Sequence, residues 1–252
     1  MGITNDIETL RTWIKECPKG GMVFFGGAGV STESGIPDFR SSDGLFMQDY
    51  QIPPEQIVSR SFFEAHPADF YDFYFNHMIF PDVEPNQAHR KLAELEQEGI
   101  LSAVITQNVD GLHQKAGSKN VFELHGSSLK NYCCSCRKQF TFEEFVALRK
   151  QALIRETNDS TSNSALNGVP RCPECGGIVR PDVVLYEEGL DQNTIRKSIE
   201  AISNADVLII GGTSLAVYPA AGLIDYYRGN KLVLINKSST PKDSRADLII
   251  ND

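Results

Sequence analysis

Four of the chain's six cysteines stand in two pairs whose spacing is typical of a metal site. The pairs are Cys133-x-x-Cys136 and Cys172-x-x-Cys175. Each pair can occupy two corners of a tetrahedron, and four thiolates together form a closed structural zinc site without an open position for catalysis. We predict structural zinc at these four residues, with the adjacent Cys134 as the alternative to Cys133. The polar tract 158–164 lengthens the interval between the pairs, and we expect it to be a mobile loop.

A glycine-rich turn, residues 26–32, follows directly after an apolar run. Glycine lets the backbone approach a pyrophosphate closely and leaves N–H groups free to point at it. The dinucleotide-binding fingerprint is incomplete, because Gly27-x-Gly29 is followed by Thr32 where a third glycine or an alanine is expected. The turn favours a bound nucleotide over a plain tight turn, and it disfavours an ordinary hydride-transferring dehydrogenase.

The next segment, residues 34–41, brings a proline, an acid, an aromatic ring and a cation into immediate succession. Arg40 can pair with a phosphate group, and Phe39 can cover a flat ring. The alternative is an ordinary loop with a buried aromatic side chain.

Polar residues also stand where two further apolar runs end. The segment 107–110 follows the run 102–105, and His125 follows the run 121–124. Open α/β sheets bind their ligands beyond the carboxyl ends of the strands, which is where these side chains belong. An imidazole with an ordinary pKa of about 6.5 is suited to proton abstraction at neutral pH. We predict His125 as a general base, with a structural histidine as the alternative.

Short, wholly apolar runs indicate strands that are buried on both faces of a parallel sheet. They are residues 22–25, 102–105, 207–210, 232–235 and 248–250. Helical stretches alternate with them, at residues 6–17, 88–98 and 194–203. An aromatic-rich segment, residues 61–80, reads as a further helix that can form a wall or lid. This alternation predicts an α/β fold, a doubly wound parallel (Rossmann-like) sheet with a small zinc-binding module and a helical lid.

The same pattern predicts two domains that interleave along the chain. The Rossmann-like, dinucleotide-binding domain is expected to comprise residues 1–40, 81–129 and 181–252. The small domain is expected to comprise a helical and cofactor-loop segment, residues 41–80, together with the zinc-binding module, residues 130–180.

The charge balance limits the kinds of partner. With 24 Lys and Arg against 33 Asp and Glu, the formal net charge is −9. Nucleic-acid binding needs clustered cations, so we expect no direct nucleic-acid contact and a basic partner such as a lysine-rich peptide. The N-terminus lacks a basic start followed by an apolar run, and no stretch approaches about 20 apolar residues. We therefore expect a cytoplasmic monomer with reduced thiols and no membrane association.

Taken together, these residues closely resemble the sirtuin family of NAD-dependent protein-lysine deacylases, in its bacterial form. The matching segments are residues 27–31, 35–40, 85–89, 106–113, 124–126, 180–186 and 212–215, with Val217, Pro219, Ala220 and the two cysteine pairs. The likeness covers essentially the whole chain in the right order, and its specificity lies in the joint occurrence of these segments.

The resemblance implies a reaction in which NAD is a co-substrate. In sirtuins the acyl-lysine oxygen attacks C1′ of the nicotinamide ribose and expels nicotinamide, which gives an alkylamidate. The residue that matches His125 is the general base toward the ribose hydroxyls, and the residue that matches Asn108 positions the ribose and the attacking oxygen. Transfer of the acyl group to ADP-ribose then frees the lysine.

The resemblance also implies which residues bind NAD and the acyl-lysine peptide. The expected cofactor-binding residues are Gly27, Ala28, Gly29, Thr32, Phe39, Arg40, Gln107, Val109, Asp110, Gly212, Thr213, Ser214 and Asn236. Of these, Gln107, Val109 and Asp110 are expected to form the nicotinamide pocket, and Phe39 to shield the ribosyl centre. The expected substrate-binding residues are Val184, Tyr186, Glu187 and Val217. The peptide is expected to lie as an added strand between residues 182–186 and the loop around Val217.

The chain departs from the family pattern after Tyr186. The family usually has a glycine there, whereas this chain has Glu187, whose side chain can crowd the added strand or strengthen a preference for basic peptides. Sirtuins that prefer succinyl or malonyl groups carry a tyrosine and an arginine three residues apart in the helical lid. Here Tyr71 is followed at that spacing by Tyr74, and Tyr74 by His77, so we expect an acetyl or a longer neutral acyl group.

Two alternatives belong to different classes of function. Protein mono-ADP-ribosyl transfer uses the same intermediate with another nucleophile, and transfer of label to protein instead of acyl loss distinguishes it. An NAD-binding or zinc-ribbon interaction protein without catalysis is the second alternative. The acidic composition argues against a zinc ribbon that binds nucleic acid.

Overall fold

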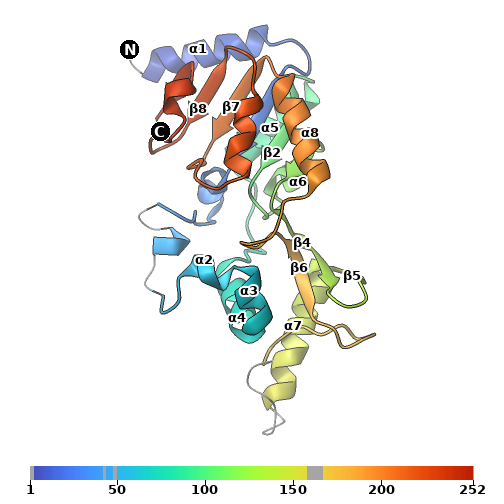
Figure 1. The fold of residues 1–252 in the computed structure, drawn as a ribbon. Coiled ribbons are helices and arrows are strands. Elements are labelled where there is room, and N and C mark those ends of the chain that lie inside the picture. Colours follow the sequence, from blue (N-terminus) through green and yellow to red (C-terminus); the bar gives the residue numbers. More distant parts are fainter. Residues whose placement is uncertain (1–2, 42–43, 48–49, 158–166, 252) are drawn as a thin grey trace. The chain divides into compact units, whose positions relative to one another are not determined.

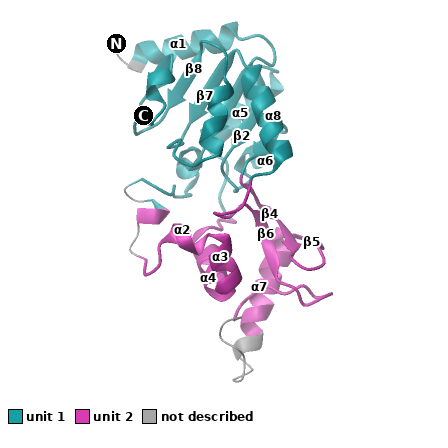
Figure 2. Ribbon diagram, in the orientation of Figure 1, with its two compact units in different colours: residues 1–44, 82–124, 190–252 teal, residues 45–81, 125–189 magenta. Residues whose placement is uncertain are grey.

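The computed structural model describes residues 3–41, 44–47, 50–157 and 167–251. The tract 158–164, expected to be a mobile loop, lies outside the described residues. The chain divides into two compact units, each assembled from separate segments of the sequence (Figure 2). Unit 1 comprises Met1–Gly44, Asp82–Leu124 and Leu190–Asp252, and unit 2 comprises Leu45–Pro81 and His125–Gly189.

Unit 1 is built on a six-stranded sheet whose strand pairs are all parallel (Figure 1). Its strand order is β3-β2-β1-β7-β8-β9. The strands are β1 (Met22–Gly26), β2 (Leu101–Thr106), β3 (Val121–Glu123), β7 (Val207–Gly211), β8 (Leu232–Ile235) and β9 (Leu248–Ile250). Every residue of β1 and β7 is buried, as expected for wholly apolar runs at the centre of a parallel sheet.

Helices cover both faces of this sheet (Figure 1). The α-helices are α1 (Ile3–Glu16), α5 (Gln87–Gln97), α6 (Leu112–Ala116) and α8 (Gln192–Ser203), and the 3-10 helices are η1 (Ala28–Ser34), η4 (Ala220–Tyr226) and η5 (Asp243–Arg245). Trp13 of α1 and Leu92 of α5 pack in one hydrophobic cluster with Met22 and Phe24 of β1. Helix α8 contacts β2, β3 and η4. The predicted doubly wound α/β fold is therefore confirmed.

The structure confirms the predicted strands, whereas the predicted helical segment 61–80 differs in detail. Each of the five runs predicted as strands lies within one strand of the sheet. The segment 61–80 is helical as far as His77, but it forms two helices, α3 (Arg60–Ala65) and α4 (Pro67–His77), and not one. Pro67 disfavours helical backbone at His66 and cannot donate an N–H, so it becomes the first residue of a new helix.

Unit 2 contains a three-stranded antiparallel sheet and a group of helices. The sheet has the order β5-β4-β6, with β4 (Gly126–Cys133), β5 (Gln139–Thr141) and β6 (Val179–Val183). The helices are η2 (Leu45–Met47), α2 (Pro54–Ile57), α3, α4 and α7 (Phe142–Thr157). The core is rich in buried aromatic rings, including Phe70, Tyr71, Tyr74 and Phe145. The Tyr71 hydroxyl donates to the Val179 carbonyl (2.6 Å) and so joins α4 to β6.

Strand pairing explains where the segments of unit 2 begin and end. Gly126 pairs with Val183, and Cys133 pairs with Val179. Residues 125–129 and 181–189 accordingly belong to unit 2, although the expected boundaries place both segments in the larger domain. Among the described residues, no helix is long and apolar enough to cross a membrane.

Candidate active site

The order of the strands identifies the carboxyl ends of the central strands of the unit 1 sheet as the place for a ligand. Strand β1 lies between β2 and β7, so the chain runs outward from β1 in one direction through β2 and β3 and in the other through β7, β8 and β9. Such a reversal opens a crevice at the carboxyl ends of the two central strands, and open α/β sheets bind their ligands there. The glycine-rich turn after β1 and the Gly212 turn after β7 both lie at this position.

These two turns contact each other through glycine backbones. The Gly29 N–H donates to the Gly212 carbonyl (2.8 Å), and the Gly27 N–H donates to the Gly211 carbonyl (3.2 Å). A Cβ on Gly29 would lie 2.8 Å from the Gly212 Cα, and a Cβ on Gly212 would lie 2.4 Å from the Val30 nitrogen. Gly212 also has a positive φ of 59°. Glycine is therefore required at both positions, because only without a Cβ can the two turns approach each other this closely.

An open hollow of about 260 Å³ lies beside η1. It is lined by Thr32, Gly35, Ile36, Pro37, Asp38 and Ser41. The Asp38 carboxylate shapes this loop by accepting the N–H groups of Arg40 (2.9 Å) and Ser41 (2.7 Å). Thr32, predicted to bind the cofactor, borders the hollow, while Phe39 is half-buried and Arg40 is exposed. The hollow is large enough for part of a dinucleotide.

A buried hydrogen-bond network joins the turn after β1 to the turn after β2. The Ser31 hydroxyl donates to Asp110 Oδ2 (2.7 Å) and accepts from Asn108 Nδ2 (3.1 Å). Ser31 is 1% exposed and Asn108 is 9% exposed. The network thereby fixes the amide of the predicted catalytic Asn108 and the carboxylate of the predicted pocket residue Asp110. Ser31 was missed as a site residue, although a serine inside a phosphate-binding type of turn was a usable signal.

A second network brings together three of the predicted cofactor-binding residues. Gln107 Nε2 donates to Thr213 Oγ1 (2.9 Å). The Asn236 side chain bonds the backbone of Thr213 twice, accepting its N–H (2.9 Å) and donating to its carbonyl (3.1 Å). The turns after β2, β7 and β8 are thus held to one another at the carboxyl edge of the sheet.

Two buried histidines lie close to this edge. Asn86 begins α5, its side chain accepting the N–H groups of Ala88 and His89 while the His89 ring accepts the Asn86 N–H. Asn86 also donates from Nδ2 to the Val30 carbonyl (2.7 Å), which holds the glycine-rich turn. The rings of His89 and His113 meet edge-on at 4.7 Å between centroids. Burial, together with His89, lowers the pKa of His113 to about 3, so the imidazole is neutral in the folded protein.

The predicted general base and three of the predicted substrate-binding residues belong to unit 2. The His125 carbonyl accepts the Val184 N–H (2.9 Å) immediately beside the Gly126–Val183 pair of the β4–β6 sheet. The backbone continues as the segment 184–186, and Tyr186 is 38% exposed. The other predicted residues, Asn108, Val217 and the cofactor-binding set, belong to unit 1, where the Val217 carbonyl accepts the Ala221 N–H (2.9 Å).

A bidentate ion pair supports the turn that follows this segment. Arg180 donates from both terminal nitrogens to Glu188, at 2.7 and 3.0 Å, and also donates to the Val183 carbonyl (2.7 Å). Glu188 in turn accepts the Leu185 N–H (2.9 Å). Burial opposes ionisation of Glu188, but the hydrogen bond from Arg180 prevails and lowers the pKa of the carboxyl. The sequence analysis missed this pair because the seven residues between Arg180 and Glu188 give no sign that the chain turns back.

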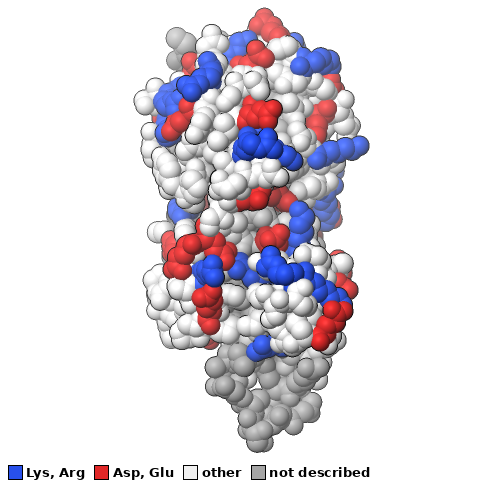
Figure 3. Space-filling view, turned by 45° about the vertical axis from the view of Figure 1, so that its right-hand side comes forward, with Lys and Arg blue, Asp and Glu red and all other residues white. Residues whose placement is uncertain are grey.

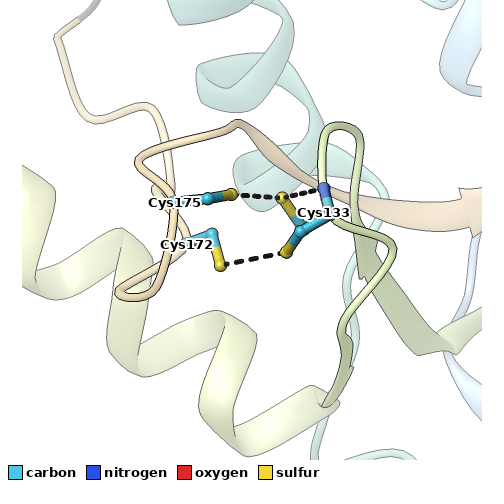
Figure 4. Close-up of side chains that lie close together, drawn as sticks. Cys133, Cys172 and Cys175 are labelled. Atoms are coloured by element: carbon cyan, nitrogen blue, oxygen red, sulfur yellow. Dashed lines mark hydrogen bonds between the residues drawn. The ribbon is translucent and has the colours of Figure 1, made fainter.

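The four predicted zinc ligands come together in unit 2 (Figure 4). Their sulfurs all lie within 4.8 Å of one another, with Cys133 Sγ 3.5 Å from Cys175 Sγ and Cys136 Sγ 3.7 Å from Cys172 Sγ. A tetrahedral zinc ion with Zn–S bonds of about 2.3 Å requires sulfur separations of about 3.8 Å, so the cluster fits zinc. Cys134 does not belong to this cluster, and its N–H donates to the Ile178 carbonyl (2.8 Å).

Both cysteine pairs use the same type of turn. The residue after the second cysteine of each pair has a left-handed backbone, with φ of 64° at Arg137 and 73° at Gly176. Burial opposes ionisation of Cys133, but hydrogen bonds from the backbone of Cys136 and Ser135 lower the pKa of its thiol to about 7.

Comparison with known proteins extends over nearly the whole chain. The sequence model of the Sir2 family matches residues 27–219. An NAD-dependent protein deacetylase of Clostridium perfringens is 59% identical over 249 residues, covering 98% of this chain and 94% of the relative. An NAD-dependent protein deacetylase of Cutibacterium acnes is 48% identical over 247 residues, covering 97% and 93%.

Solved structures give the same result. A Sir2 structure with a p53 peptide and NAD⁺ is similar with a TM-score of 0.79 and 39% sequence identity, covering 98% of this chain and 92% of that chain. A structure of Sir2Tm bound to a propionylated peptide has a TM-score of 0.81 and 38% identity, with the same coverage. The similarity thus includes residues of both compact units.

Proposed function

Because this chain belongs to the Sir2 family, the sirtuins, we propose that it is an NAD-dependent protein-lysine deacetylase. It transfers the acyl group of an acyl-lysine to ADP-ribose and releases nicotinamide. The observation that carries the proposal lies at the reversal point of the sheet, where two glycine-containing turns meet through their backbones next to the Ser31–Asn108–Asp110 network. Glycine turns suit a pyrophosphate, and a fixed amide beside a carboxylate suits a ribose and a carboxamide.

Unit 1 is the proposed NAD-binding domain, and unit 2 is the proposed small domain with the zinc module. NAD supplies a ribosyl carbon that carries nicotinamide as its leaving group. The cofactor-binding residues are proposed to be those expected from the sequence, with Gln107, Thr213 and Asn236 held in one network and Ser31 added to the set. Their contribution is to bind and orient NAD without reorganisation, because their side chains already hold one another in place.

His125 and Asn108 are proposed to be the catalytic residues. The imidazole of His125 takes the proton of a ribose hydroxyl, a role for which histidine is suited at neutral pH. Asn108 orients the ribose and the attacking acyl oxygen, and its bond to Ser31 fixes which way the amide faces. Phe39 covers the ribosyl centre and keeps water from it.

The acyl-lysine peptide is proposed to pair through its backbone with the segment 184–186 and with the loop around Val217. Backbone pairing supplies affinity with little sequence preference. Neither Tyr71 nor Tyr74 is followed at the relevant spacing by an arginine, and both are fully buried in unit 2. No cation at these positions can attract a succinyl or malonyl carboxylate, so acetyl or a longer neutral acyl group is the proposed substrate.

The remaining proposals concern zinc, partners and location. Zinc bound by the four cysteines would hold the two turns of the small domain together and takes no part in the reaction. On the face shown in Figure 3, Lys and Arg side chains are interspersed with Asp and Glu, and the described residues of that face form no continuous basic field. This distribution supports a protein that does not contact nucleic acid directly. A cytoplasmic monomer is proposed, since the thiolate cluster requires reduced cysteines.

The test is to incubate the purified protein with an acetyl-lysine peptide, with and without NAD, and to follow the products by mass spectrometry. We expect free lysine peptide, nicotinamide and acetyl-ADP-ribose to appear only with NAD. His125→Ala should abolish them, whereas the matched control His66→Ala, at an exposed histidine of the same unit, should not. Acyl loss without NAD, or full activity of His125→Ala, would contradict the proposal. ADP-ribose attached to protein would instead establish the alternative transferase.

A further inference from the structure

The turn that ends the proposed peptide-binding segment contains a residue in an unfavourable conformation. Residues 185–188 form a four-residue turn, closed by the bond from the Glu188 N–H to the Leu185 carbonyl (3.0 Å). Glu187, the third residue of the turn, has a positive φ of 75°. Turns with a positive φ at this position favour glycine, because a Cβ clashes with the neighbouring carbonyl. A compensating interaction must therefore hold Glu187 in place.

The carboxylate of Glu187 makes that interaction with the start of α3. Its Oε2 accepts the backbone N–H of Ser61, and its Oε1 accepts the Ser61 hydroxyl, both at 2.9 Å. A carboxylate is favoured at this position because the first N–H groups of a helix have no partner within the helix. Both carboxylate oxygens are thus engaged within unit 2.

The same region of the chain holds the peptide-binding segment itself. The Tyr186 N–H donates to the Val58 carbonyl (3.1 Å), and the Tyr186 carbonyl accepts the Arg60 N–H (3.0 Å). Ser59 and Tyr186 accordingly form an isolated parallel bridge. One edge of the segment 184–186 is therefore paired with residues 58–60, and the Glu187–Ser61 contact lies at the end of that pairing.

We propose that Glu187 is a positioning residue for the substrate peptide. Its contact with Ser61 keeps the turn closed and the segment 184–186 extended, so that the backbone is already in the shape that pairing with an acyl-lysine peptide requires. This inference rests on the proposed deacetylase function. It gives Glu187 a different role from the expected ones, which were to crowd the added strand or to strengthen a preference for basic peptides.

Because Glu187 has a positive φ, the proposal predicts which of two substitutions at this position raises the peptide KM more. Glu187→Ala loses both bonds to Ser61 and keeps a Cβ at positive φ, whereas Glu187→Gly loses the same bonds but relieves the strain. We expect the peptide KM to rise about fivefold in Glu187→Ala and about twofold in Glu187→Gly, where a tenfold change corresponds to about 1.4 kcal/mol. The KM for NAD should change less than twofold. Glu187→Gln can still accept the Ser61 N–H and should restore the peptide KM to within twofold of wild type.

Two further variants separate this role from general damage to the fold. Ser61→Ala removes the hydroxyl bond to Glu187 together with the contact between the Ser59 and Ser61 hydroxyls (3.3 Å), keeps the backbone N–H bond to Glu187, and should raise the peptide KM about twofold. The matched control Glu64→Ala breaks an exposed ion pair with Arg60 in the same helix and should leave the peptide KM unchanged. Hydrogen exchange of the amides of residues 185–188 should be faster in Glu187→Ala and Ser61→Ala. This readout requires no turnover, and it remains available where a variant is inactive.

Particular outcomes would overturn the inference. One is a peptide KM and exchange rate in Glu187→Ala that match wild type, and another is a larger defect in Glu187→Gly than in Glu187→Ala. Failure of the proposed function is a separate result, since the wild-type protein would then release no acyl group at all.

Discussion

Replacement of Glu188 by glutamine removes one charge from the buried ion pair with Arg180 and changes little else in size or shape. The Arg180 side chain is 9% exposed and that of Glu188 is 18% exposed, so the guanidinium keeps almost no access to water when its partner is neutralised. Breaking a buried pair from one side costs about 3–5 kcal/mol, and the partial exposure of Glu188 places the expected loss near about 3 kcal/mol. For a chain of this size, that loss lowers the melting temperature by roughly 6–12 °C.

The assay is thermal and urea unfolding of the zinc-loaded protein, with Glu64→Gln as the matched control. Glu64 pairs with Arg60 at the surface, where both side chains are more than half exposed, and its loss should cost less than about 0.5 kcal/mol. The double variant Arg180→Met with Glu188→Leu should recover most of the stability, because no unpaired charge is then buried. A loss below about 1 kcal/mol in Glu188→Gln would refute the reasoning, since Arg180 would then have another way to satisfy its charge.

Three further changes have expected outcomes. Gly29→Ala places a Cβ 2.8 Å from the Gly212 backbone, so NAD affinity measured by calorimetry should fall about 10- to 100-fold, and an unchanged affinity would contradict the close approach of the two turns. Removing zinc with a chelator should abolish cooperative unfolding of unit 2 and be reversed by added zinc, whereas unaltered melting after complete zinc loss would show that the cluster does not stabilise the fold. The pKa of His113, about 3 in the folded protein, lies below that of the unfolded chain, so its contribution is complete above about pH 6.5 and is lost toward pH 3, at up to about 1.4 kcal/mol per pH unit. Urea unfolding at several pH values should show this slope in wild type and in the control His66→Asn but a smaller slope in His113→Asn, and equal slopes in all three would contradict it.

The elements that could be predicted are those whose cause is local. The apolar runs at β8 and β9 coincide with the strands because a wholly apolar run has no polar face to expose. The break between α3 and α4 could have been predicted from Pro67, which is the first residue of α4. The sequence analysis did not predict it, because it considered only the aromatic composition of the segment. The antiparallel sheet of unit 2 was not predicted, because Gly126–Cys133 and Val179–Val183 pair across an interval that includes the zinc ligands.

The residues of the candidate site also divide into those that local sequence predicts and those that depend on contacts between distant segments. The cysteine ligands and the glycine turns follow from spacing and residue type alone. The contact of Ser31 with both Asn108 and Asp110 depends on β1 and β2 being neighbours in the sheet. No local sequence pattern predicts which strands are neighbours. The positive φ of Glu187 and its bonds to Ser61 depend on pairing between distant segments. A glutamate at this position also argued against a turn with positive φ, which favours glycine.

The interleaving of the two units sets an order for their completion during synthesis. The last segment of unit 2 ends at Gly189, and unit 1 still lacks Leu190–Asp252 at that point. Domains tend to fold as they emerge, and at usual rates of synthesis the missing 63 residues take roughly 3 to 12 s. All four cysteines leave the ribosome before Gly212, the partner of Gly29. The four zinc ligands are therefore all synthesised before the two glycine turns of the candidate dinucleotide site can meet.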